Sequence, residues 1–311
     1  MQHSNLAQTV VMVPPTDFGF NPQTADDNDF QHVPTESAIE VTARAMQEFE
    51  EMVEKLKRHD LQILLMEKED DHVTPDAVFP NNWFLTTPDG GIFFFPMKTE
   101  NRRQEVRPKA LCHLFVKNGF TVNYTVHLGG EIEDRPPLEG TGALVFDHMT
   151  DTVFAAMSER CDLHMLQQFQ KFYRSKKVIS FPTMSSTGHP VYHTNVMLSI
   201  GVDFAVICPD VIAPTHLQKV LGALSVQHKS IIKVTEEQMN QFCCNILQLK
   251  NKKGDRIIVM STTALNAFTT QQKNTLSCHG KIIAVDIPTI ESVGGGSARC
   301  MIAEVFQGCD D

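Results

Sequence analysis

Three side chains with the chemistry of nucleophilic catalysis lie far apart in this sequence. Cys300 follows the glycine-rich stretch Gly294 to Ser297, and His193 and Glu139 lie well upstream of it. A thiolate attacks carbon, an imidazole transfers protons, and a carboxylate holds an imidazole or a polar substrate. Glycines let the backbone pass close to a ligand. Taken alone, Cys300 would more often be a core thiol, but the set predicts covalent catalysis if the fold brings the three side chains together.

The spacing of short β-type runs explains how such distant residues can meet. Five times, one run is followed by a loop and then by a β-hairpin whose polar tip contains Gly or Asp, residues that favour tight turns. The single runs begin near residues 62, 120, 177, 230 and 281, a period of roughly 50 to 58 residues. Such a period is typical of a propeller or ring. The alternative is an unspecialised α/β fold in which the spacing is accidental.

The repeat predicts an α/β fold: a five-bladed αβ propeller with pseudo-fivefold symmetry, formed by residues 1–311 as one domain. Each unit would contain one strand, one hairpin and one helix. The last segment, residues 298–306, lacks a hairpin partner, which the strand expected at Thr9 to Val13 could supply. A capping pattern at Ser37 predicts a helix over Ser37 to His59. Further helices are expected at 103–118, 163–174, 213–227 and 264–274, and hairpins at 82–97, 143–156, 195–208 and 245–260.

The residues that enter the hairpins share one position in the repeat. Equivalent positions converge on the axis of a closed ring, so we expect these side chains to line one central cavity. They would supply a thiol, a proton-transferring group, a carboxylate and several amides, which are the parts that nucleophilic catalysis requires. The residues at this position are Asn82, Glu139, His193, Asn195, Asn245 and Cys300.

The composition argues against several other classes of protein. A formal net charge of −10 does not suit nucleic-acid binding, because phosphate recognition needs clustered Lys and Arg. No apolar run approaches the roughly 20 residues of a membrane span, and no signal peptide is recognisable. The eight cysteines, which include Cys309, form no disulfide framework, and the thirteen histidines have no metal-binding spacing. We therefore expect reduced thiols, a cytoplasmic location, and no metal or organic cofactor.

On these residues the sequence resembles the guanidino-group modifying superfamily, the pentein enzymes that include arginine deiminase, agmatine deiminase and dimethylarginine hydrolase. The resemblance extends from Val11 to Phe306 and is greatest for the citrulline-utilisation hydrolase group. It implies a five-bladed αβ propeller in which Cys300 is the nucleophile, His193 transfers protons and Glu139 holds substrate N–H groups. The motifs are Phe18-Gly19-Phe20-Asn21 with Thr24 and Asn28, Val78-Phe79-Pro80-Asn81-Asn82-Trp83-Phe84, Glu139-Gly140-Thr141-Gly142, and Gly294 to Cys300.

Two departures from the deiminase pattern bear on the substrate. Deiminases usually carry Asp at the positions of Asn82 and Asn195. A guanidinium is a cation with N–H donors only and favours carboxylates, whereas a neutral ureido group also offers a carbonyl acceptor that suits an amide. The two amides therefore favour hydrolysis of citrulline to ornithine, ammonia and carbon dioxide. Arginine dihydrolases of the superfamily also use Asn near the first position, so an arginine dihydrolase or deiminase remains the alternative.

An amino-acid substrate also needs an anchor for its carboxylate. Arginine suits this role because its guanidinium makes bidentate contacts, and Arg103 and Arg160 match family positions after the first two hairpins. The alternative is that both are ordinary surface arginines. Asn81, next to Asn82, is expected to contact the substrate, and Asn28 is expected to belong to an N-terminal lid.

Two other functions would share parts of this architecture. A non-catalytic propeller could bind a macromolecule, but it would not need Cys300, His193 and Glu139 together. An amidinotransferase would share the thiol and the imidazole, but it should retain acidic contacts to the guanidinium. The sequence shows no interpretable subunit interface, so a monomer, a homodimer and larger assemblies remain open.

Overall fold

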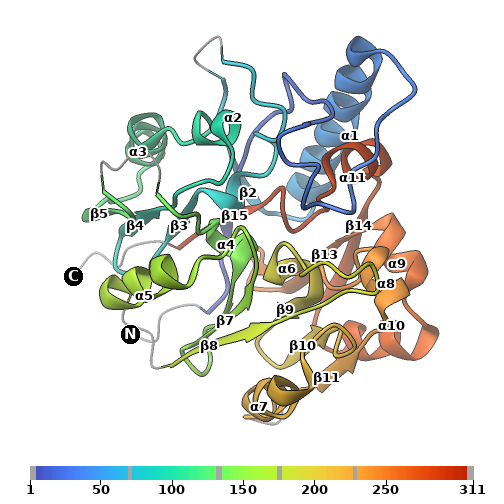
Figure 1. Ribbon diagram of the computed structural model, residues 1–311. Coiled ribbons are helices and arrows are strands. Elements are labelled where there is room, and N and C mark those ends of the chain that lie inside the picture. Colours follow the sequence, from blue (N-terminus) through green and yellow to red (C-terminus); the bar gives the residue numbers. More distant parts are fainter. Residues whose placement is uncertain (1–4, 69–71, 131–134, 174–176, 227–229, 307–311) are drawn as a thin grey trace.

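The computed structural model describes residues 5–68, 72–130, 135–173, 177–226 and 230–306. Within these ranges the strands form five separate three-stranded sheets. Figure 1 shows the sheets arranged about a common centre, with the longer helices at the periphery. The predicted five-bladed α/β propeller is therefore confirmed.

Each blade joins an antiparallel hairpin to a parallel third strand. Strand β3 (Phe84–Thr86) pairs antiparallel with β4 (Gly91–Phe94), which pairs in parallel with β5 (Tyr124–His127). A parallel connection needs a crossover, and α3 (Pro108–Lys117) supplies it. The order recurs in β6 (Leu144–Asp147), β7 (Thr152–Met157) and β8 (Lys177–Pro182), in β9 (Leu198–Ile200), β10 (Phe204–Ile207) and β11 (Ser230–Lys233), and in β12 (Leu247–Lys250), β13 (Arg256–Ser261) and β14 (Lys281–Val285).

Each single strand therefore belongs to the sheet of the hairpin before it. The sequence repeat, taken from a strand to the hairpin after it, runs across the boundary between two blades. The fifth blade joins the two ends of the described chain: β15 (Ala303–Val305) pairs antiparallel with β1 (Thr9–Met12), and β1 pairs in parallel with β2 (Gln62–Leu65). The predicted closure of the ring by the N-terminal strand is thus confirmed.

The outer helices follow the sequence signals, with two interruptions. Helix α1 (Ala38–Arg58) begins at Ser37 with the predicted capping box and buries one apolar face. The segment expected at 103–118 is divided into α2 (Glu100–Arg103) and α3, because Pro108 fits only the first turn of a helix. The segment expected at 264–274 is divided into α9 (Thr262–Ala267) and α10 (Thr270–Ser277), where Thr269 caps a new start. The other crossover helices are α5 (Leu163–Phe172) and α7 (Pro214–Leu224).

Short buried turns lead from the outside of the propeller into its inner strands. They are η1 (Pro80–Asn82), α4 (Gly140–Ala143) and α6 (Thr194–Met197), and every residue in them is buried. Turn α4 packs against both η1 and α6. Because equivalent turns meet at the centre, the side chains that they carry face one another, as the repeat predicts.

Two further sequence expectations concern membranes and thiols. Among the helices of the described ranges, none is both long and apolar enough to cross a membrane. The seven described cysteines are free thiols; Cys278 is exposed and most of the others are buried. Cys309 lies outside the described residues.

Candidate active site

The inner turns bring the predicted catalytic side chains to one buried centre. Glu139 precedes α4, His193 precedes α6, and Cys300 follows the glycine-rich segment after α11 (Pro288–Gly294). Their exposed fractions are 0%, 2% and 3%. Asn82, Asn195 and Asn245 are equally buried beside them. The structure thus gathers all six residues that share the hairpin-entry position.

Glu139 fixes the protonation of His193. The Nε2 atom of His193 lies 2.8 Å from Oε2 of Glu139. Burial alone would raise the pKa of Glu139, but Arg160, the bond to His193, and Arg102 hold it well below its ordinary value. Burial and the two arginines lower the pKa of His193 despite the carboxylate. A neutral imidazole must then donate Nε2–H to the carboxylate, which leaves Nδ1 as a proton acceptor.

Two amide groups surround the sulfur of Cys300. The Nδ2 atom of Asn245 lies 3.2 Å from Sγ, and that of Asn195 lies 3.5 Å from it. Asn245 cannot turn around, because its Oδ1 accepts the backbone N–H of Arg299 at 3.0 Å. Both contacts to sulfur in the described chain are therefore N–H donors, an arrangement that suits a negatively charged thiolate.

Arg102 forms a buried charged network next to this centre. Its guanidinium bonds Glu105 through Nε and Nη2 and lies 3.5 Å from Glu139 and 3.9 Å from Asp76. Burial raises the pKa of Glu105 to about 7, although Arg102 opposes that shift. A fourth partner is neutral: Nη1 donates to Oδ1 of Asn82 at 2.9 Å.

The contact with Arg102 fixes the orientation of Asn82. A guanidinium has only donors, so the oxygen of the amide must face Arg102 and the NH₂ group must face away. This Nδ2 is buried without a hydrogen-bond partner. It lies close to His193 across Gly142, where an added Cβ would stand 2.4 Å from Nδ2 and 2.8 Å from Nδ1 of His193. Because Gly142 has no side chain, space remains between Nδ2 of Asn82 and Nδ1 of His193.

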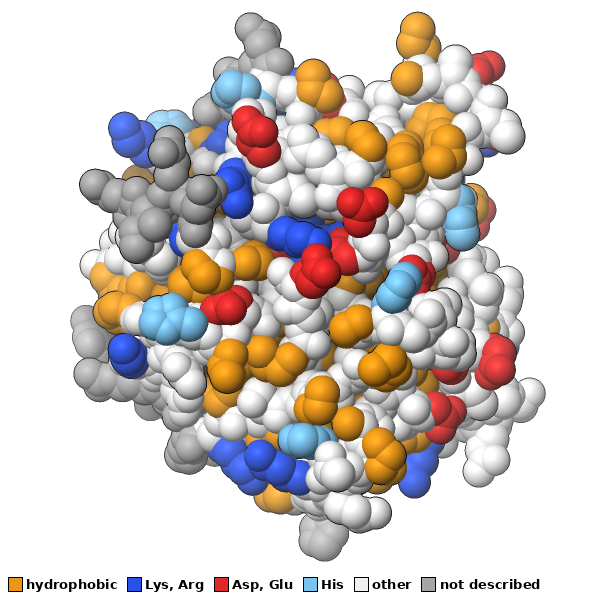
Figure 2. Space-filling model, viewed as in Figure 1, with side chains coloured by type: hydrophobic (Ala, Val, Ile, Leu, Met, Phe, Trp, Pro, Cys, Tyr) orange, Lys and Arg blue, Asp and Glu red, His pale blue; other side chains and the backbone are white. Residues whose placement is uncertain are grey.

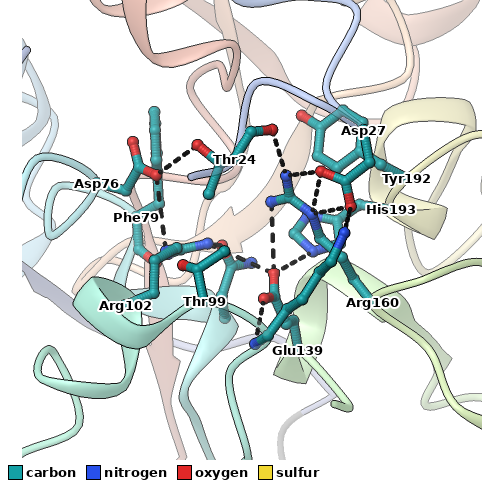
Figure 3. Close-up of polar contacts among 12 residues, drawn as sticks. Thr24, Asp27, Asp76, Phe79, Thr99, Arg102, Glu139, Arg160, Tyr192 and His193 are labelled. Atoms are coloured by element: carbon teal, nitrogen blue, oxygen red, sulfur yellow. Dashed lines mark hydrogen bonds and ion pairs between the residues drawn. The ribbon is translucent and has the colours of Figure 1, made fainter. Parts of the chain in front are cut away.

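Arg160 joins the carboxylate of Glu139 to the N-terminal segment. Its Nη1 lies 3.6 Å from Glu139, and its guanidinium lies over the ring of Tyr192, 4.9 Å from the centroid. On its other side it bonds both oxygens of Asp27 and the backbone carbonyl of Thr24. Figure 3 shows Arg160 between Asp27 and Glu139.

Other proposed substrate-binding residues occupy different environments. Arg103 is exposed and donates to the carbonyls of Met97 and Lys98, so Arg102, not Arg103, is the arginine of α2 that enters the site. Adjacent residues of a one-turn helix point in different directions, and the sequence carried no signal to choose between them. Asn81 is fully buried, and neither polar atom of its side chain has a partner.

The N-terminal segment 14–32, here called the strap, closes over these residues. Asn28 approaches Gly295, where an added Cβ would lie 2.5 Å from Nδ2 of Asn28. Asn21 donates to Asp76 at 2.7 Å and accepts from Asn101 at 2.8 Å. Asp27 and Asp76 were not predicted site residues, because both lie in irregular segments outside the repeat.

A propeller of five αβ blades with a buried cysteine, histidine and glutamate at its centre defines a pentein enzyme. The model of the family "N,N dimethylarginine dimethylhydrolase, eukaryotic" matches residues 14–307, and the chain belongs to this family. It is a hydrolase of the guanidino-group modifying superfamily that acts on C–N bonds. No curated protein sequence matches the chain significantly.

Solved structures share the fold at low sequence identity. ArgZ, an arginine dihydrolase from cyanobacteria, superimposes with a TM-score of 0.75 and 18% identity, over 96% of this chain and 40% of the ArgZ chain. The N-terminal domain of ArgZ, as a cysteine-to-serine variant bound to substrate, gives a TM-score of 0.72, 19% identity, and coverage of 96% and 98%. A dimethylarginine dimethylaminohydrolase with an S-methyl-L-thiocitrulline adduct gives a TM-score of 0.65 and 14% identity. The match covers 96% of this chain and 100% of that chain. The chain thus spans less than half of full-length ArgZ.

Proposed function

We propose that this protein hydrolyses the ureido group of citrulline. The observation that carries the proposal is the fixed Nδ2 donor of Asn82, which is buried beside the catalytic imidazole without a partner. A buried donor of this kind is unfavourable by about 1–3 kcal/mol until an acceptor reaches it. The carbonyl oxygen of a ureido group is such an acceptor. A guanidinium has none, and would place N–H against N–H.

The remaining amides complement the other half of a ureido group. Oδ1 of Asn195 and Oδ1 of Asn81 are buried acceptors without partners. They could receive the N–H groups that a ureido also carries. Within the described residues, the carboxylate that contacts His193 is that of Glu139, and Arg102 and Arg160 already neutralise it. Among the described residues the amides thus offer hydrogen bonds of both kinds, whereas Asp76, 3.9 Å from Arg102, keeps one buried oxygen without a partner.

The proposed reaction proceeds through a covalent intermediate on Cys300. Nδ1 of His193 takes the thiol proton of Cys300, the thiolate adds to the ureido carbon, and one C–N bond breaks as the departing nitrogen takes that proton from His193. A water deprotonated by Nδ1 of His193 then hydrolyses the thiocarbamate and restores the thiol. The carbamic acid that is released loses carbon dioxide as its remaining C–N bond breaks. Citrulline and water give ornithine, ammonia and carbon dioxide. Glu139 keeps the imidazole oriented and stabilises its protonated form.

Arg160 is the proposed anchor of the substrate carboxylate. Its planar guanidinium is held by Tyr192 and Glu139, and the face toward the strap binds a carboxylate in the present structure. Arg103 does not serve this purpose, since its side chain is committed to carbonyls at the surface. We keep the expectation of a cytoplasmic enzyme that needs no cofactor.

Arginine dihydrolysis is the second candidate. The free amide oxygens of Asn81 and Asn195 could accept from a guanidinium, and a similar fold is present in an arginine dihydrolase. Arginine would have to meet the donor of Asn82 with another donor. We therefore expect arginine to be the poorer substrate.

A substrate panel with product analysis tests the proposal. The protein is incubated separately with citrulline, arginine and asymmetric dimethylarginine, and ornithine, citrulline and ammonia are quantified. Ornithine and ammonia in equal amounts from citrulline alone support the proposal. Ornithine from arginine at a higher rate would favour the dihydrolase, and citrulline accumulating from either guanidino compound would contradict ureido hydrolysis.

A further inference from the structure

The catalytic centre is buried, and the strap contacts residues around it through Thr24, Asp27 and Asn28. Cys300 and His193 are 3% and 2% exposed, so a substrate cannot reach them without movement of the chain. Directly outside lies a surface hollow of about 460 Å³, lined among others by Asp27, Tyr192 and Thr187. Of these lining residues, Asp27 bonds Arg160, and the ring of Tyr192 lies 4.7 Å from that of His193. Viewed from the side used in Figure 1, acidic and basic side chains gather near the centre of the face in Figure 2.

Asp27 binds the guanidinium of Arg160 as an amino-acid carboxylate would. Its Oδ1 lies 2.5 Å from Nη2, and its two oxygens lie 3.2 and 3.1 Å from Nε. Lys98 adds a second cation at 2.9 Å. Burial opposes ionisation of Asp27, but Arg160 and Lys98 hold its pKa below the ordinary value, so the group is a carboxylate. Figure 3 shows its carboxylate directed at the guanidinium.

One guanidinium edge cannot hold two carboxylates in the same place. We propose that Asp27 is an internal latch that occupies the carboxylate subsite at Arg160, and that the substrate carboxylate exchanges with it as the strap opens. The exchange rests on the proposed function, since it requires an amino-acid substrate. The latch makes entry selective: a urea without a carboxylate has nothing to exchange with Asp27. It also reduces the apparent affinity in proportion to the fraction of molecules in which the latch is open, because only these molecules bind substrate.

The test measures access to Cys300 without any substrate. Iodoacetamide alkylation is followed by mass spectrometry of the Cys300 peptide, and the exposed Cys278 serves as an internal reference. In Asp27→Asn, Cys300 should react about tenfold faster, because a neutral amide loses the charge-assisted pair, while Cys278 is unchanged. Arg160→Gln should also speed alkylation. Asp29→Asn is the matched control, because this next strap carboxylate bonds Thr187 and His189 at the surface; it should change neither rate.

The two variants should have opposite effects on the KM for citrulline. Asp27→Asn removes a competitor and lowers KM by about the same factor by which alkylation rises. Arg160→Gln removes the anchor and raises KM. If both variants raise KM, the pair only stabilises the strap, and the latch is excluded. Unchanged alkylation of Cys300 in Asp27→Asn also excludes it, even if citrulline is turned over. Faster alkylation in a protein that does not hydrolyse citrulline would instead count against the proposed function and leave the latch intact.

Discussion

The centre of the propeller contains two regions that differ in charge. In the described chain the side chains that contact the sulfur of Cys300 are the amides Asn195 and Asn245, and a third amide, Asn82, lies beside His193. Beyond Glu139 the side chains are ions, with two arginines and at least three further carboxylates in contact with one another. The amides and most of the ions are buried, although Asp27 is partly exposed, so exposure to solvent does not explain the difference.

From this difference in charge between the two regions we infer where each end of a substrate is recognised. Buried ions need partners, and the arginines and acids of the charged region provide them for one another. The amide side chains of the described residues have unsatisfied donors and acceptors and carry no charge. We infer that the amino-acid end of a substrate is recognised by charge and the reacting end by neutral hydrogen bonds, and that His193 lies where the two regions meet.

The largest effect is expected at the sulfur of the amide region. Cys300→Ala should reduce kcat by at least about 10⁴-fold, because the covalent route disappears. Citrulline should still bind, as measured by calorimetry, since the contacts to its carboxylate are retained. The control is Cys278→Ala, at the exposed residue that follows α10, and this variant should keep full activity. Substantial turnover by Cys300→Ala would rule out the covalent mechanism.

A single methyl group should disrupt the gap between Asn82 and His193. In Gly142→Ala the new Cβ would fall 2.4 Å from Asn82 and 2.8 Å from the imidazole, so both must shift. Misplacement of this size should lower kcat/KM by about 10²-fold. Gly222→Ala in α7 is the matched control, because its Cβ would meet nothing within 4 Å. Normal activity of Gly142→Ala would mean that this gap does not hold the reacting group.

Replacing the fixed donor of Asn82 should change which substrate is preferred. Asn82→Asp presents an acceptor in place of Nδ2 and keeps an oxygen for Arg102. The ratio of kcat/KM for citrulline over arginine should fall by about 10²-fold, because a mispaired buried group is strongly discriminated against. The control is Asn101→Asp, at a residue that bonds Asn21 of the strap and should leave the ratio unaltered. An unchanged ratio would show that Asn82 does not recognise the ureido oxygen.

The smallest effect concerns pH. In the proposed reaction His193 acts through its neutral form, and burial with the two arginines lowers its pKa below the ordinary 6.5. The kcat/KM for citrulline should therefore be level at neutral pH and fall only as pH drops below about 6.5. Arg160→Gln removes one neighbouring positive charge and should move this acid limb to higher pH. An acid limb above 7 in the unaltered protein would contradict a neutral imidazole.

The sequence located the ring and the residues that the repeat determines. Cys300, His193, Glu139 and Asn245 could be placed together because each enters an inner strand at the same point of a regular period. The choice between Arg102 and Arg103 could not be made, because it depends on the orientation of a single helical turn after Thr99. Asp27 and Asp76 were not predicted for a related reason. Both lie in irregular backbone outside the repeat, where no period indicates their position.

Transfer of the ureido carbon tests the central claim most directly. Citrulline labelled with ¹³C at the ureido carbon is incubated with the protein and followed by NMR. We expect the label to move to carbon dioxide and bicarbonate as ornithine forms, and to stay in citrulline with Cys300→Ala. Label that remains in citrulline with the active protein, while the guanidino carbon of labelled arginine is released, would contradict ureido recognition at the amide region.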